Sequence, residues 1–216
     1  MDDPDGDLLQ RAYEGDEGAF RALYERHRRP LFRFTYRMLG AAPVSEDVVH
    51  ECFLVLLTHR GRFDPSRGSL RTFLCAVARN LSFKQLRRRG VETATDDVPE
   101  PEPAEVPEAP APLRQLLEGE RTAAVQEAVS ALPPLQREVL ILFEYEGHSL
   151  AEVGEIVSAD VGTVKARLHR ARERLRRTLA PWLKTPPTGA GTAERPAART
   201  AGHTGLVRAR AVERMA

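Results

Sequence analysis

Basic side chains are gathered in two short runs, and such runs can neutralise the phosphates of a nucleic acid. Residues 79–89 (RNLSFKQLRRR) hold five basic side chains and no acid, and residues 163–177 (TVKARLHRARERLRR) hold seven basic side chains and one acid. Between them, residues 91–112 hold seven acids, six prolines and no basic residue, so the formal net charge of +1 hides a strong segregation. We therefore expect two separate contacts with a polyanion.

Side chains that could carry out catalysis form no recognisable group in the sequence. The two cysteines, Cys52 and Cys75, give neither a disulfide framework nor a paired metal-binding motif. We interpret Cys52 as a small core residue, and His27 and His148 as structural or surface residues. The sequence predicts a protein that is not an enzyme and has no catalytic residues, cofactor or metal.

Helical periodicity runs through the residues that lead to the first basic run. Apolar residues recur every three or four positions from Phe20 onward, Pro30 permits a fresh helix start, and Ser45 offers an N-cap for a third helix. A helix after the loop 61–68 then continues into the basic run, and Cys75 lies one residue off its apolar stripe. Strict alternation typical of a sheet does not persist anywhere.

The second basic run belongs to a predicted helix-turn-helix. Ser149 and Glu152 match a capping box, in which each side chain satisfies a backbone donor at the start of a short helix. A tight break follows at Ser158, and Asp160 caps a last helix from about Val161 to Leu179. This helix has an apolar face at about 100° per residue, formed by Val164, Leu168, Ala171 and Leu175.

The N-terminal turns of a recognition helix face base edges in the major groove. We therefore expect bases to be read by the opposite face of the last helix, with Arg167 flanking it, and phosphates to be bound by arginines further along. The base-facing set is Lys165, Ala166, His169 and Arg170.

The predicted fold class is all-α, with two small helical domains at 1–90 and 113–183. Residues 91–112 are interpreted as an acidic, proline-rich flexible linker, and residues 184–216 as a disordered tail. No apolar run approaches the roughly 20 residues that cross a bilayer, and the acidic N-terminus is unlike a secretory signal. We expect a cytoplasmic protein without direct membrane insertion.

Longer stretches resemble a known family. FRALYERHRRPLFRFTYRMLG, SEDVVHECFLVLL and FDPSRGSLRTFLCAVARNLSFKQLRRR resemble domain two of bacterial extracytoplasmic-function (ECF) sigma factors. LPPLQREVLILFEYEGHSLAEVGEIV and VGTVKARLHRARERLRR resemble their domain four. The resemblance covers roughly residues 8–89 and 113–183, in the family's order, and implies a dissociable subunit that gives RNA polymerase core its promoter choice.

The same resemblance implies roles for individual residues. A face of the third helix would dock on a coiled coil of the polymerase's largest subunit, through Asp47, His50, Glu51 and Leu54. Domain two would bind the opened minus-10 element through Arg67, Arg71, Asn80, Lys84, Arg87 and Arg88, and a loop matching Phe63–Ser69 would receive a flipped base. Domain four would bind the minus-35 duplex of promoter DNA through Thr163, Lys165, Ala166, Arg167, His169 and Arg170. An anti-sigma factor is expected as a further partner.

One departure and several alternatives bear on this interpretation. Ser158 stands where the family's turn usually has Gly, so a positive φ there would strain the serine by roughly 1 kcal/mol. The acidic linker is either an inert spacer or threads the polymerase channel. A one-site helix-turn-helix regulator would leave the first basic helix idle, and a helical enzyme or ligand-binding module would need convergent groups that the sequence lacks. Dependence of DNA binding on polymerase core separates the first alternative from a sigma factor.

Overall fold

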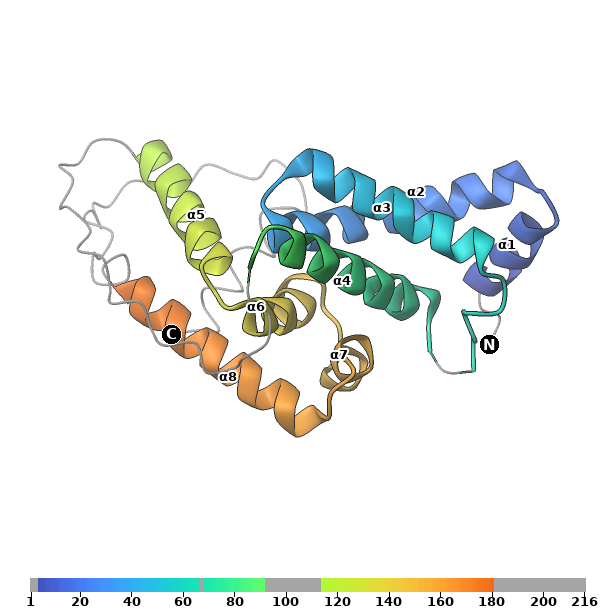
Figure 1. Ribbon diagram of the computed structural model, residues 1–216. Coiled ribbons are helices and arrows are strands. Elements are labelled where there is room, and N and C mark those ends of the chain that lie inside the picture. The colour runs from blue at the N-terminus through green and yellow to red at the C-terminus, as the bar shows by residue number, and fades with distance from the viewer. Residues whose placement is uncertain (1–3, 67, 92–113, 181–216) are drawn as a thin grey trace, which may run out of the picture.

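The computed structural model is helical throughout the residues that it describes, which are 4–66, 68–91 and 114–180 (Figure 1). The predicted tail lies outside these residues, as does the predicted linker apart from Val91. Within the described ranges, no helix is both long enough and apolar enough to cross a membrane.

The N-terminal segment consists of α1 (Pro4–Tyr13), α2 (Glu17–Leu39), α3 (Ala42–Thr58) and α4 (Leu70–Arg88). α2 packs against each of the other three, and α3 against α4, around fully buried Leu23, Phe34 and Leu74. Ser69 caps α4 by accepting a hydrogen bond from the amide of Thr72. The first basic run therefore lies along the second half of a helix that the core holds in place.

Two boundaries differ from the prediction. Pro30 does not separate two helices but lies inside α2, because buried Leu31 and Phe34 continue the face of His27 and their packing outweighs the missing amide donor. α3 begins at Ala42, before the predicted N-cap Ser45. Ser45 is buried inside the helix instead, where its hydroxyl donates to the carbonyl of Ala41 at 2.8 Å.

The C-terminal segment consists of α5 (Arg114–Ser130), α6 (Pro134–Leu140), a π-helical turn η1 (Ile141–Tyr145), α7 (Leu150–Val157) and α8 (Val161–Thr178). The predicted capping box is confirmed, since Ser149 accepts from the amide of Glu152 and Glu152 accepts from the amide of Ser149. Asp160 caps α8 as predicted. Ser158 has φ 55° and ψ 48°, so the turn does place this serine in the left-handed region.

The two segments pack against each other through a single continuous core. α4 lies between α3 on one side and α6 and α7 on the other (Figure 1). Cys75, predicted to lie off the apolar stripe, is buried, because the second segment covers a face of α4 that would otherwise meet solvent. Periodicity within α4 could not reveal this second covered face.

Candidate functional site

The outer face of α8 presents the side chains expected to read bases. Lys165, Ala166, His169 and Arg170 are all exposed there. Thr163 is half-buried and belongs to the cap, because its amide and hydroxyl donate to the carboxylate of Asp160 at 2.9 and 2.6 Å. These hydrogen bonds hold the pKa of Asp160 below its usual value, so the cap stays charged.

Arg167 takes a different position from the exposed set. Its side chain is only 14% exposed, and Nη1 lies 3.9 Å from Oε1 of Glu138 on α6. The structure thus directs Arg167 inward, toward the core of the C-terminal segment. Arg172, one turn further along, donates from Nε to Oε1 of Glu144 at 3.1 Å and lies over the ring of Phe143. Both arginines attach α8 to the α6–η1 element.

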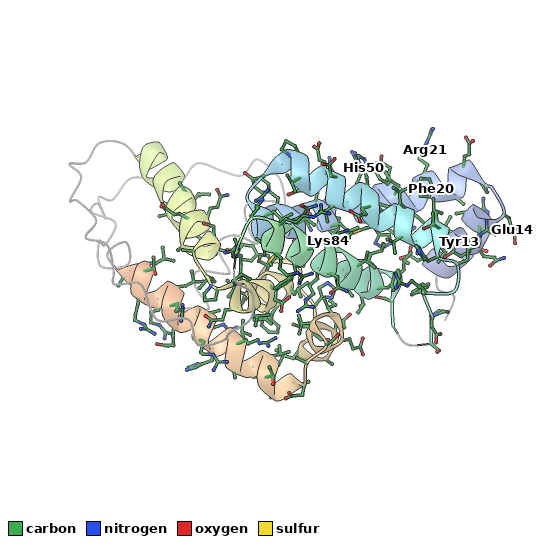
Figure 2. The ribbon with its side chains drawn as sticks, in the orientation of Figure 1. Tyr13, Glu14, Phe20, Arg21, His50 and Lys84 are labelled. Atoms are coloured by element: carbon green, nitrogen blue, oxygen red, sulfur yellow. The ribbon has the colours of Figure 1, made fainter. Side chains whose placement is uncertain are left out.

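The C-terminal half of α4 carries a second basic surface. Asn80, Lys84, Arg87 and Arg88 are exposed, as expected for residues that contact DNA. Figure 2 shows Lys84 on the part of α4 that adjoins α3. Its Nζ is 3.6 Å from Oε1 of Glu51 on α3. Arg71 is half-buried and donates to the backbone carbonyl of Glu146. Arg67 lies outside the described residues.

The outer face of α3 combines acidic and apolar groups. Asp47 and His50 are exposed, Glu51 is partly exposed, and Leu54 is 59% exposed. The imidazole of His50 stacks on the ring of Tyr24, with centroids 6.3 Å apart and planes 9° from parallel. The four side chains expected to dock on polymerase therefore share one accessible face, and an exposed leucine on such a face suits a protein partner.

Two buried carboxylates lie where the segments meet, and no local pattern in the sequence predicted either of them. Glu138 has a side chain with 0% exposure and accepts from Nε of Arg79 at 2.6 Å and from Nη2 at 3.3 Å. Glu146 is 1% exposed and accepts from Arg33 at 2.9 Å and Arg37 at 3.4 Å. Buried carboxylates need such partners, because an isolated charge in an apolar interior is very costly.

A buried thiol and imidazole lie in the same interface. Cys75 Sγ of α4 is 3.5 Å from Nε2 of His148, which precedes α7. Burial raises the pKa of Cys75 to about 12, and burial together with nearby Arg71 lowers the pKa of His148 to about 4. Both groups are therefore neutral at pH 7, and this pair does not resemble a reactive thiolate.

In the part of the chain that the structure describes, no three His, Cys, Asp or Glu side chains group so as to hold an ion. The chemistry available at the surfaces is the binding of anionic polymer at α8 and α4 and of a protein at α3.

Comparison with known proteins finds a separate match for each of the two segments. The chain matches the family models described as sigma-70 region 2, over residues 23–91, and sigma-70 region 4, over residues 122–175. It is 30% identical over 177 residues to the ECF RNA polymerase sigma factor SigW of Bacillus subtilis, and the match covers 79% of this chain and 94% of SigW.

Two solved structures are also similar. CnrH, in complex with the cytosolic domain of CnrY, aligns with a TM-score of 0.61 at 24% identity, over 83% of this chain and 99% of CnrH, and this likeness shows the fold. The sigma factor RpoE in complex with the anti-sigma factor NepR, from Bartonella quintana, aligns with a TM-score of 0.56 at 25% identity, over 74% of this chain and 96% of RpoE.

Proposed function

Because the chain belongs to the extracytoplasmic-function RNA polymerase sigma factors, we propose that its two basic surfaces bind two different elements of one promoter. Members of this family direct transcription initiation by RNA polymerase and are not enzymes. The observation that carries the proposal is the exposed set Lys165, Ala166, His169 and Arg170 on the capped helix α8, together with a second exposed basic surface on α4.

In this proposal α8 reads the minus-35 duplex. Lys165 and Arg170 can bond to guanine in the major groove, Ala166 admits close approach or a thymine methyl, and His169 lies between them. Thr163 supports the cap at the DNA-facing end of the helix. Arg167 supports the orientation of α8 from inside, since its side chain lies against Glu138.

The surface of α4 captures the opened minus-10 element. Asn80 can hydrogen-bond an unstacked base, while Lys84, Arg87 and Arg88 neutralise the backbone of the single strand. Arg67 and Arg71, with the loop before α4, would hold a flipped base. Binding of unstacked bases supplies free energy for melting without nucleotide hydrolysis.

Two protein partners complete the proposal. The α3 face of Asp47, His50, Glu51 and Leu54 docks on polymerase core, because exposed carboxylates around one leucine complement a basic helical surface. An anti-sigma factor binds the chain when transcription is not required. The similar structure of RpoE with its anti-sigma factor NepR supports this second partner.

The assignment of the two DNA elements is tested with holoenzyme on a promoter from which it initiates. Footprinting measures occupancy of the upstream duplex, and permanganate reactivity of thymines measures melting. We expect K165A/R170A to lose the upstream footprint, and N80A/R87A to keep it while losing permanganate reactivity.

The control is R21A/R28A, which removes two exposed arginines from α2 and should leave both signals unchanged. If K165A/R170A retains the upstream footprint, or if the control loses it equally, the assignment of α8 to the minus-35 element is wrong.

A further inference from the structure

Most polar contacts between the two segments share one direction of charge, with the exception of Arg137 on α6, whose Nη1 donates to the carbonyl of Met38 on α2 at 2.8 Å. In the other arginine contacts the N-terminal segment supplies guanidinium groups, and the C-terminal segment supplies a backbone carbonyl and two carboxylates, which are anionic as phosphate is. Arg79 pairs with the Glu138 carboxylate, Arg33 and Arg37 pair with that of Glu146, and Arg71 donates to the Glu146 carbonyl.

The two contacts made by α4, through Arg71 and Arg79, fall on or beside the surface assigned above to the minus-10 element. Arg71 belongs to that surface, and Nη1 of Arg79 donates to the side-chain oxygen of Asn80 at 3.2 Å, so the pair with Glu138 also engages Asn80. In the loop before α4, Gly68 lies beside Glu155 of α7, where an added side-chain carbon would be 3.5 Å from the carboxylate. The C-terminal segment therefore covers one edge of the α4 surface.

Arg79 lies at the border between the covered face of α4 and its exposed face. At about 100° per residue, it is separated from Asn80 by about 100° and from Arg87 by about 80°. Its side chain is 18% exposed, and the guanidinium lies over the ring of Phe83. A long side chain at this position can reach either Glu138 or a phosphate bound along Asn80 and Arg87.

Glu138 connects both DNA-binding helices through one carboxylate. Arg79 approaches it from α4, and Arg167 approaches it from α8. If α4 moved away, Glu138 would become hydrated while keeping Arg167 beside it within the same segment. Breaking a buried ion pair is strongly unfavourable when it leaves one charge buried without a partner. Opening avoids this cost, because Glu138 keeps Arg167 beside it.

We propose that Glu138 and Glu146 hold the free chain closed by occupying its arginines in place of DNA, and that Arg79 becomes a further phosphate-binding residue for the minus-10 strand when the segments separate. The inference rests on the proposed role of α4. Polymerase core and promoter DNA would then compete with an internal acidic surface, so that the free chain binds DNA weakly and the assembled holoenzyme binds it well.

Two native thiols report on opening without any label. Cys75 lies in the interface against His148, whereas Cys52 is fully buried in the core of the N-terminal segment. Alkylation of the free full-length chain by N-ethylmaleimide, followed by mass spectrometry, gives a rate for each thiol. Separation of the segments exposes Cys75 alone, while unfolding exposes both.

The variants are Glu138→Gln and Glu146→Gln, with Glu173→Gln as the control because Glu173 is partly exposed and its ion pair lies within α8, with Arg176. We expect E138Q to raise the Cys75 rate about tenfold with the Cys52 rate unchanged, and to raise affinity for a single-stranded oligonucleotide of randomised sequence by a similar factor. E138Q/R79A should show the faster Cys75 rate without the gain in affinity. E173Q should change neither quantity.

The results of these experiments test separately whether the carboxylates hold the segments together and whether the covered edge of α4 binds DNA. An unchanged Cys75 rate in both E138Q and E146Q means that these carboxylates do not hold the segments together, and the proposed function is untouched. A faster Cys75 rate without a gain in affinity means that the covered edge of α4 does not bind DNA. If Cys52 also reacts faster in E138Q, that variant is unfolding. The Cys75 rate in E146Q then decides whether the carboxylates hold the segments together. Failure of the proposed function itself appears separately, as loss of core-dependent promoter melting.

Discussion

Arg172 of α8 donates from Nε to Oε1 of Glu144 at 3.1 Å, and Glu144 belongs to the π-helical turn η1. The side chain of Glu144 is only 4% exposed, so this pair attaches the recognition helix to the interior of its segment rather than to the solvent. A π-helical turn shifts the direction of the side chains that follow it, and such turns are frequent at functional sites. The orientation of α8 thus depends on a local irregularity beside it.

Removal of the arginine from this pair should destabilise the C-terminal segment. R172A leaves the nearly buried Glu144 carboxylate without its counter-charge, and we expect a loss of about 2 kcal/mol in the free energy of unfolding by urea. R176A is the control, because Arg176 and Glu173 are both substantially exposed, and it should cost less than about 1 kcal/mol. Equal losses in the two variants would show that Glu144 does not anchor α8.

The protein should lose stability as the pH falls, because the titration of His148 differs between the folded and the unfolded chain. Burial lowers the pKa of His148 from 6.5 to about 4 in the folded chain, with Arg71 adding to the shift. Between these two values the unfolded chain binds a proton that the folded chain does not, so stability is full above about pH 6.5 and is lost as pH falls toward 4.

Urea unfolding at several pH values between 7.5 and 4.5 measures this loss, which approaches about 3 kcal/mol for one histidine. H148Q should remove this contribution to the slope. His27, whose pKa burial also lowers, remains in both proteins and cancels in the comparison. Identical slopes for the native chain and H148Q would contradict the assignment.

The left-handed backbone at Ser158 should make a glycine there favourable. S158G relieves the strain at φ 55° and is expected to raise the free energy of unfolding by about 1 kcal/mol. The converse change is G147A, since Gly147 has φ 72° and open space around it, and it should cost a similar amount through backbone strain alone. A destabilised S158G would mean that the serine makes a compensating contact.

The exposed face of α3 should be needed for polymerase but not for folding. We expect D47N and L54A each to weaken binding to core polymerase at least about tenfold, because interface anchors of this kind contribute 1–2 kcal/mol. Thermal stability should be unchanged, since both side chains are exposed. D7N, which alters another exposed aspartate on α1, is the matched control in a competition assay with labelled native chain. Native affinity in both variants would place the core-binding surface elsewhere.

Local rules predicted much of this structure from the sequence. The capping box at Ser149, the cap at Asp160 and the outward set Lys165, Ala166, His169 and Arg170 all depend on residues within one or two helical turns of each other. The same information predicted the helical nature of both segments. It misplaced the start of α3, because Pro43 in the first turn outweighed Ser45 as a signal.

The interface between the segments could not be predicted in this way. Arg79 and Glu138 both occupy polar positions that helical periodicity assigns to solvent. Their side chains nevertheless pair in the interior, although 59 residues separate them in the sequence. Cys75 lies off the apolar stripe of its own helix and is nevertheless buried, because the C-terminal segment covers it. The π-helical turn at Ile141–Tyr145 likewise has no periodic signature. Each of these features is decided by tertiary packing rather than by local preference.

The most direct test of the sigma-factor mechanism is transcription by core polymerase from a library of templates with randomised upstream sequence, with and without the purified chain. Sequencing of the transcripts identifies which templates were used and where synthesis began. We expect start sites that appear only when the chain is present and that share two upstream elements, with K165A/R170A losing selection at the distal element alone. Transcripts that share no upstream element, or a chain that binds core and yields no start site, would contradict this mechanism.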